Sequence, residues 1–194
     1  HQRNYLVLHA GAIRANDCSN IFLGPSGIGK STLAAGFHQR GYPFLADDVC
    51  AVAMLHGKPC VIPGFLQLKL WNDVLKILGR DKDQLKSVVW SNNLEKYFMP
   101  VEQAQEHPVP LKTVFDLKAQ NTDHPSITML TGAAKIDSFI KNTYRLGFLH
   151  GLGGKTEHFR HCAAVASQTN VYQVERPQNS FVLDELMDMM ETKF

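Results

Sequence analysis

The run GPSGIGKS, from Gly24 to Ser31, constrains the fold more than any other part of this sequence. It matches the pattern G-x-x-x-x-G-K-[S/T] at every fixed position, with an apolar run at 20–24 before it and good helix formers at 30–41 after it. A glycine-rich turn in this setting points backbone N–H groups and the positive end of a helix at phosphate oxygens. The sequence therefore predicts a phosphate-binding loop between a strand and a helix of an α/β fold.

The loop residues have separate predicted roles. Lys30 is a cation that can reach the β- and γ-phosphates of a nucleotide, and Ser31 offers a hydroxyl to Mg²⁺. No guanine-reading N/T-K-x-D motif is recognisable, so ATP is favoured over GTP as the nucleotide. The residues predicted to hold it are Gly24, Pro25, Ser26, Gly27, Ile28, Gly29, Lys30, Ser31 and Thr32.

Composition narrows the class of protein. The 194 residues are 44% hydrophobic and 20% charged, which predicts a single soluble domain spanning 1–194. The net charge of +2 is too small to indicate nucleic acid or a membrane surface as a partner, and no apolar run is long enough to span a membrane. The chain begins at His1 rather than Met, so we expect a piece of a longer protein, and an N-terminal domain is left open.

The four cysteines, Cys18, Cys50, Cys60 and Cys162, form no C-x-x-C pair, so we expect reduced thiols in a cytoplasmic protein. His158, His161 and Cys162 lie close in sequence, but a helix would turn His161 away from the other two, which argues against zinc.

Apolar periodicity and turn residues predict alternating strands and helices. Strands are predicted at 5–13, 20–24, 42–48, 49–55, 60–71, 109–119 and 170–177. Helices are predicted at 30–41, 72–79, 126–144 (interrupted at Gly132), 157–168 and 180–194, with a further short helix at 82–90. Turns are predicted at 14–20 and 56–59, and the glycine-rich run at 145–155 is predicted to be a mobile loop.

Asp47 and Asp48 end an apolar run, where two adjacent like charges are costly unless they have partners. A kinase needs one carboxylate near Mg²⁺ and another to orient or deprotonate the acceptor hydroxyl. The pair comes on the first predicted strand after the loop helix, which is more typical of kinases for small acceptors than of motor ATPases. The alternative is a solvated pair at the end of a strand.

Taken together, LHA at 8–10, GPSGIGKST and RGYPFLADDV resemble the C-terminal catalytic domain of HPr kinase/phosphorylase, a bacterial protein-serine kinase. That family has a histidine before the phosphate loop, an R/K-G turn and L-x-[A/S]-D-D, which correspond here to His9, Arg40–Gly41 and the run 45–49. The match covers residues 8–50. The family's E-x-R-G-x-G stretch is replaced here by VIPGFLQLKLW, which has no glutamate and puts HPr as the substrate in doubt.

The resemblance implies a P-loop kinase domain of the HPr kinase type, with a mixed central sheet flanked by helices. It implies that one aspartate is the acid/base and the other faces the metal. We assign Asp47 to the first role and Asp48, with Ser31, to the metal. His9 would lie near the transferred phosphate, and Lys30 would stabilise the charge on that phosphate.

These observations predict an ATP-dependent serine kinase that uses ATP and Mg²⁺ and acts on a peptide or protein. A resemblance to divergent HPr-kinase-like proteins adds the C-terminal serine of a lasso-peptide precursor as a candidate acceptor. The alternatives are a small-molecule hydroxyl kinase, a non-enzymatic nucleotide sensor and a plain ATPase. The sequence leaves a homo-oligomer open.

Further basic residues are weaker candidates. Arg145, Arg160 or Arg176 could offset charge on the transferred phosphoryl group, although each is more often a structural or surface arginine. Lys155 could hold a carboxylate of the acceptor, and the loop at 145–155 could close over the substrate.

Overall fold

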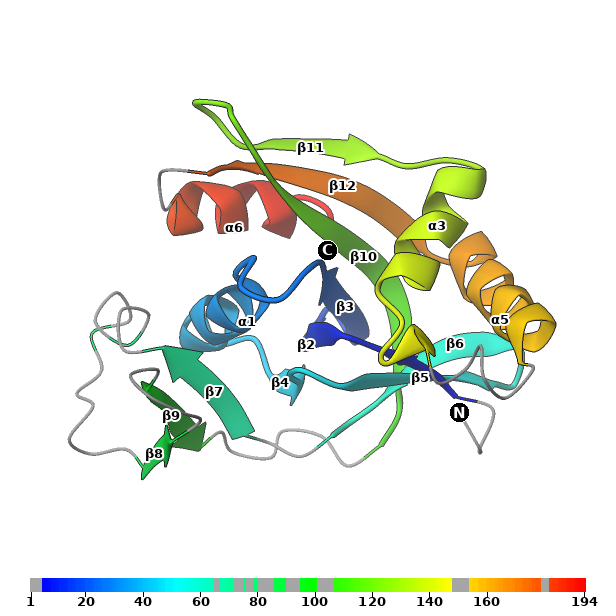
Figure 1. The fold of residues 1–194 in the computed structure, drawn as a ribbon, viewed down its shortest axis with the longest axis horizontal. Coiled ribbons are helices and arrows are strands. Elements are labelled where there is room, and N and C mark those ends of the chain that lie inside the picture. The colour runs from blue at the N-terminus through cyan, green and yellow to red at the C-terminus, as the bar shows by residue number, and fades with distance from the viewer. Residues whose placement is uncertain are drawn as a thin grey trace.

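The computed structural model describes residues 5–64, 67–71, 75, 79, 86–89, 95–100, 107–147, 154–178 and 182–194. Within these segments, helices flank a curled mixed sheet (Figure 1). The strands are β1 (Leu6–Leu8), β2 (Ala10–Ala15), β3 (Cys18–Leu23), β4 (Phe44–Ala46), β5 (Cys50–Leu55), β6 (Lys58–Ile62), β7 (Gln67–Trp71), β8 (Lys86–Val89), β9 (Glu95–Pro100), β10 (Val109–Gln120), β11 (Ser126–Met129) and β12 (Asn170–Pro177). The helices are α1 (Lys30–Gln39), α3 (Ala133–Lys141), α5 (Lys155–Ser167) and α6 (Leu183–Glu191). The predicted mixed α/β class is confirmed.

Strand β10 joins the parts of the main sheet. Its first residues pair antiparallel with β6, its middle pairs parallel with β3, and its second half pairs parallel with β12. The sheet continues as β6-β5-β1 on one side and β3-β2-β4 on the other, and a separate sheet has the order β7-β9-β8. Because β3 leads into GPSGIGKS, the phosphate loop begins at the carboxyl end of a strand that has neighbours on both sides.

Alternate residues of the central strands point to two different cores, as the period of two in a strand requires. Phe22 and Phe115 belong to the core that contains residues of α1 and α6, whereas Ile21 and Val114 belong to the core that contains residues of α3 and α5. All four side chains are fully buried. Figure 1 shows the same division, with α1 and α6 near one another and α3 and α5 together elsewhere on the sheet. The helix that follows the phosphate loop is therefore fixed against the sheet.

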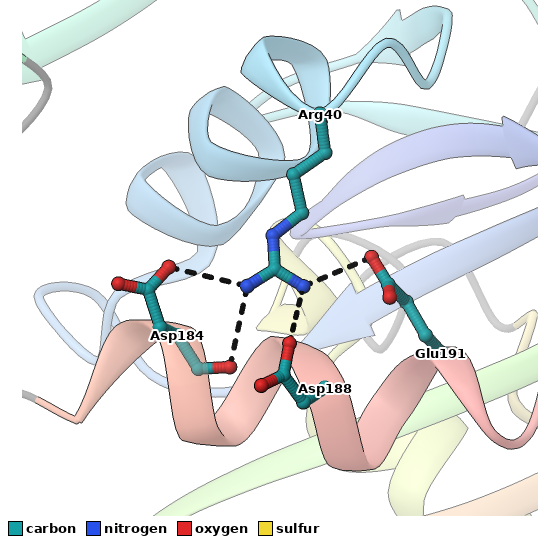
Figure 2. Close-up of polar contacts among 4 residues, drawn as sticks. All are labelled: Arg40, Asp184, Asp188 and Glu191. Carbon is teal, nitrogen blue, oxygen red and sulfur yellow. Dashed lines mark hydrogen bonds and ion pairs between the residues drawn. The ribbon is translucent and has the colours of Figure 1, made fainter.

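Arg40, directly after α1, connects this helix to α6 (Figure 2). Its Nη2 donates to Asp184 Oδ1 at 3.1 Å, and its Nη1 donates to Asp188 Oδ1 at 2.6 Å and to Glu191 Oε1 at 3.1 Å. The two helices also approach closely at Gly36, where a Cβ would lie 2.8 Å from the sulfur of a buried methionine of α6. The C-terminal helix thus rests on the helix of the phosphate loop.

Most predicted elements are confirmed. The strands predicted at 20–24, 49–55, 109–119 and 170–177 correspond to β3, β5, β10 and β12. The helices predicted at 30–41, 157–168 and 180–194 correspond to α1, α5 and α6. The strand predicted at 42–48 is shorter, as β4, and the strand predicted at 5–13 is interrupted at His9 between β1 and β2. Within 60–71, the extended run is divided between β6 and β7.

Two predicted helices are wrong in part. The first four residues of the helix predicted at 126–144 form β11, which pairs antiparallel with β12, and α3 begins only after Gly132 at a φ of 55°. Within the helix predicted at 82–90, Lys86–Val89 forms β8 and pairs with β9. In both places hydrogen bonds to a neighbouring strand outweigh local helix propensity.

The turn predicted at 14–20 is narrower than expected. Asn16 and Asp17 have φ values of 48° and 61°, and they alone separate β2 from β3. Asparagine and aspartate tolerate this left-handed conformation, which suits a two-residue hairpin turn. The helix predicted at 72–79, apart from residues 75 and 79, lies outside the described residues, as does 148–153 of the predicted loop.

All four cysteines are free, and three of them are buried. In the described segments, no helix combines the length and the apolar character that crossing a bilayer requires.

Candidate active site

Gly24, Gly27 and Gly29 have φ values of 137°, 81° and 111°, which other residues rarely adopt. Gly24 is the most constrained, because a Cβ there would lie 2.9 Å from Leu117 O and 3.0 Å from Ile28 Cγ2. Helix α1 then begins without a side-chain cap and without an acidic residue in its first turn. Such a helix end, preceded by glycines, fits a bound phosphate group.

Lys30 lies over the first part of the loop. Its side chain is buried, and Nζ donates to the carbonyl oxygen of Gly24 at 2.8 Å and to that of Pro25 at 2.9 Å. An ammonium group has only donors, so both contacts can be exchanged for phosphate oxygens without leaving an acceptor of its own unpaired. The position suits the contact with β- and γ-phosphates that a lysine in this motif makes.

The structure brings Ser31 and Asp47 together. Ser31 Oγ donates to Asp47 Oδ1 at 2.9 Å, across the space between the start of α1 and the end of β4. This contact follows from the sheet, because β2 pairs with both β3 and β4 and so brings the end of β4 close to the phosphate loop. A hydroxyl and a carboxylate are oxygen ligands of the kind that Mg²⁺ prefers.

Asp48 lies at the tip of the turn that follows β4. The N–H of Val49 donates to the carbonyl oxygen of Asp47 at 2.7 Å, and Asp48, between them, has a φ of 62°. A three-residue turn of this hand is strained for a residue with a side chain.

Among the described residues, no three His, Cys, Asp or Glu side chains gather into a group that could hold a metal ion by themselves. A phosphate-bound Mg²⁺ does not need such a group, because water and phosphate oxygens supply most of its ligands. Ser31 and Asp47 therefore fit a metal that arrives with a nucleotide.

Asn142 and Asp116 fix the start of the loop, and the sequence interpretation did not include either residue. The backbone N–H of Gly24 donates to Asn142 Oδ1 at 2.8 Å, and Asn142 Nδ2 lies 3.4 Å from Asp116 Oδ1. Ser138 Oγ also donates to Asp116, at 2.8 Å. Asp116 is buried in β10 opposite Leu23, one residue before the loop. A lone acidic residue in the apolar run TVFDL was the available signal.

His9 borders a pocket of about 290 Å³ at the start of the loop. The pocket is lined by His9, by Gly24 and Pro25, and by the run 141–145, which begins at the last residue of α3. Arg145, one of the predicted basic candidates, is part of this lining.

Arg176 lies at the opposite end of the loop. Its Nε donates to Ile28 O at 3.0 Å, and burial lowers its pKa. An apolar recess there is lined by Arg176, Gly29, Thr32 and residues at the start of α6. The two ends of the phosphate loop therefore open onto surfaces of different character.

The structure separates the remaining candidates from the loop. Arg160 is exposed on α5 beside Glu157, and Lys155 is the first residue of α5 rather than the end of a loop. His158 Nε2 lies 2.7 Å from Thr143 Oγ1 and 3.5 Å from Cys162 Sγ, whereas His161 pairs with Glu157. His161 thus points away from the other two, as expected.

Comparison with protein-family models and with curated proteins gives no match. Among solved structures, the chain is similar to the Hpr(Ser) kinase/phosphatase from Coxiella burnetii, at 12% identity, covering 96% of this chain and 88% of that chain, with a TM-score of 0.43. These values describe a distant structural relationship, and they carry no argument about activity.

Proposed function

We propose that this protein is an ATP-dependent kinase that transfers the γ-phosphoryl group to a hydroxyl of a peptide or protein. The observation that carries the proposal is the contact between Ser31 and Asp47 at the end of a complete phosphate loop. A plain phosphate-binding turn does not need a carboxylate against the hydroxyl of the loop serine. A P-loop enzyme that hydrolyses or transfers a nucleotide phosphate does, because that hydroxyl and a carboxylate together hold the metal. The second carboxylate, Asp48, favours a kinase over a plain ATPase, because a kinase also needs an acid/base for its acceptor hydroxyl.

Each residue then has a defined role. The loop amides and Lys30 bind the phosphates and stabilise the charge that develops on the transferred group. Mg²⁺, when bound, would offset the charge of the phosphate oxygens. Ser31 and Asp47 would hold it. Asp48 is left to orient the acceptor hydroxyl and take its proton. The Ser31–Asp47 contact thus favours the reverse of the order predicted from the sequence, in which Asp48 faced the metal.

The proposed phosphoryl transfer is a single displacement at the γ-phosphorus. The acceptor oxygen forms a bond to the γ-phosphorus, and the bond from that phosphorus to the β–γ bridging oxygen breaks. The electron pair of the broken bond leaves with ADP, and the hydroxyl proton goes to the Asp48 carboxylate. Because most of the rate enhancement comes from positioning and charge, few protein groups are needed.

The test compares Asp47→Asn with Asp48→Asn, using labelled ATP and a panel of hydroxyl-bearing peptides. We expect Asp48→Asn to retain ATP affinity and to lose transfer by about a hundredfold or more, the typical worth of an acid/base group. We expect Asp47→Asn to raise the Mg²⁺ concentration needed for half-maximal activity. Asp123→Asn, an exposed substitution in the turn after β10, is the control.

Other outcomes select other functions. If Asp47→Asn loses transfer with an unchanged Mg²⁺ requirement, the order predicted from the sequence is right. Transfer only to small molecules would favour a small-molecule kinase. Steady phosphate release without an acceptor would identify an ATPase. ATP binding with neither activity would contradict the proposal and favour a nucleotide sensor. The C-terminal serine of a lasso-peptide precursor remains one candidate acceptor among these peptides.

A further inference from the structure

The pocket beside His9 lies at one particular end of the phosphate loop. It is lined by Gly24 and Pro25, whose carbonyl oxygens accept hydrogen bonds from Lys30 Nζ. A lysine in this motif reaches the β- and γ-phosphates, so this end of the loop borders the terminal phosphate. The apolar recess at Gly29 and Thr32 lies at the other end. If the protein is a kinase, the pocket is therefore on the side from which the acceptor approaches.

The pocket wall is held in place by the backbone. The N–H of His9 donates to the carbonyl oxygen of Asn142 at 2.8 Å, and the N–H of Tyr144 donates to that of Val7 at 2.9 Å. Between these bonds Leu8 and Thr143 form an antiparallel bridge. The side chain of Asn142 also binds the N–H of Gly24, so the wall is continuous with the phosphate loop. The geometry is thus formed before a ligand binds.

The charge of the lining is mainly basic. Lys141, Arg145 and His9 all line the pocket. Lys141 forms an ion pair of 2.5 Å with Asp137, but both side chains are mostly exposed, and such pairs are weak enough for the lysine to turn to a ligand. Arg145 lies over the Tyr144 ring, 5.3 Å from its centroid, which holds the guanidinium at the rim. A ligand that replaces water here gains most if it carries negative charge.

We infer that this pocket is the acceptor subsite and that it takes an acceptor with an anionic group beside the reacting hydroxyl. The inference rests on the proposed kinase function. A volume of about 290 Å³ suits one amino-acid residue with its charged group, since whole-ligand pockets are usually larger. The group is a carboxylate, supplied either by the C-terminus of the acceptor or by an acidic side chain next to the acceptor serine.

The experiment uses the full chain, ATP and four peptides with one common core. One peptide ends in serine with a free carboxylate, and the second ends in the same serine as an amide. The third and fourth have an internal serine followed by Asp or by Asn. We expect at least one carboxylate peptide to exceed its neutral partner about tenfold in kcat/KM, as a hydrogen-bonded charge contact is worth. A difference between the first two peptides identifies the C-terminus as the source of the carboxylate, and a difference between the last two identifies the acidic side chain.

The variants Lys141→Gln and Arg145→Gln should lower kcat/KM more for the carboxylate peptides than for their neutral partners, and so remove that preference. Neither substitution alters backbone strain, because glutamine at 145 meets the same φ of 51° that arginine does. The matched controls are Lys112→Gln and Arg160→Gln, exposed residues that do not line the pocket. Equal kcat/KM for charged and neutral peptides, or an equal loss on all four in the pocket variants, would overturn the inference while leaving the kinase proposal intact.

A binding measurement covers the case in which no peptide gains phosphate. The peptide that ends in serine with a free carboxylate, and its amide as the control, are titrated by NMR into the protein saturated with a non-hydrolysable ATP analogue and Mg²⁺, which occupies the phosphate loop. Shifts at residues 141–145 that are lost in Arg145→Gln would support an anion site even though the kinase proposal had failed. No binding in the wild-type protein would overturn the inference.

Discussion

Asp48 keeps a conformation that costs a residue with a side chain about 1–2 kcal/mol. The strained turn follows directly from β4 and lies beside the contact between Ser31 and Asp47. Glycine would adopt the same φ without this cost. The aspartate therefore lowers the stability of the fold, and its presence here calls for a role other than stabilising the fold. The contact with an acceptor hydroxyl that we propose for Asp48 would be such a role.

Asp48→Gly should therefore raise the free energy of unfolding by up to about 1 kcal/mol, the relief of strain less the entropy that glycine loses on folding, while abolishing transfer. Urea denaturation at pH 7 measures the first effect. Asp47→Gly is the control, and it should lower the free energy of unfolding by about 1–2 kcal/mol because it loses the Ser31 hydrogen bond. A clear loss of stability in Asp48→Gly would contradict the strain argument.

At this scale the sequence could predict only what is local. The phosphate loop and the aspartate pair lie within one short stretch, so their spacing alone brings them together once a strand, a helix and a strand are assigned. Asn142 meets Gly24 across 118 positions, and no local pattern marks that contact. The local sequence also does not show which aspartate contacts Ser31. The turn at Asp48 decides this, because it directs the side chains of Asp47 and Asp48 to different places.

Helix α6 is attached to α1 by polar contacts from Arg40, at the end of α1, to three carboxylates spread along α6, and by apolar packing between the two helices. Burial alone would lower the pKa of Arg40, but its hydrogen bonds to Asp188, Glu191 and Asp184 raise it above its ordinary value. The carboxylates on α6 are largely exposed at Asp184 and Asp188, so each pair contributes little by itself. All three carboxylates share Arg40 and so form a network, and exposed ion pairs contribute measurably to stability when they form a network.

Arg40→Gln should lower the free energy of unfolding by about 1 kcal/mol and speed amide hydrogen exchange in α6 about fivefold. The amides of α5, on the other core, should exchange at their original rate. Arg160→Gln breaks a contact between two exposed side chains on α5 and should leave exchange in α6 unchanged. Unaltered exchange in α6 after Arg40→Gln would show that apolar packing alone holds the helix.

The elements that were predicted wrongly share a physical cause. Both β8 and β11 are four-residue strands whose formation depends on one neighbouring strand rather than on their own residues. In contrast, β3 ends in the apolar run IFL, β10 begins with alternating buried and exposed residues, and α5 and α6 have helical spacing, so their own sequences carry the signal. Short paired strands are the elements for which a single sequence is least informative.

At the scale of the whole molecule, the rate at which the buried thiols of Cys50 and Cys162 are modified measures how often the protein unfolds. Burial raises the pKa of Cys50 to about 12. Burial also raises that of Cys162 to about 12, against a lowering by the Thr143 hydroxyl, so neither forms a thiolate at pH 8 in the folded protein. Cys18, at the start of β3, is partly exposed. A thiol reagent at pH 8 should therefore modify Cys18 rapidly and the other two only when the protein opens.

Saturating ATP and Mg²⁺, at about 100 times the dissociation constant, should slow modification of Cys50 and Cys162 about a hundredfold, since the ligand stabilises only the folded state. Lys30→Ala should remove this protection, and Cys18 serves as the internal control. The rates are read by mass spectrometry of each modified peptide. Equal rates at Cys18 and Cys50, or protection that persists in Lys30→Ala, would contradict the prediction.

The position of β10 has a consequence for how the chain is synthesised. During translation, β3 can pair with β2 as soon as their hairpin is made, but its other edge stays open until Val109–Gln120 has emerged. Asp116 and Asn142 also emerge long after β3. Until they do, the N–H of Gly24 lacks the hydrogen bond to Asn142 that fixes the start of the phosphate loop. A ribosome-bound intermediate therefore presents an unpaired strand edge, and its phosphate loop is anchored only late in synthesis.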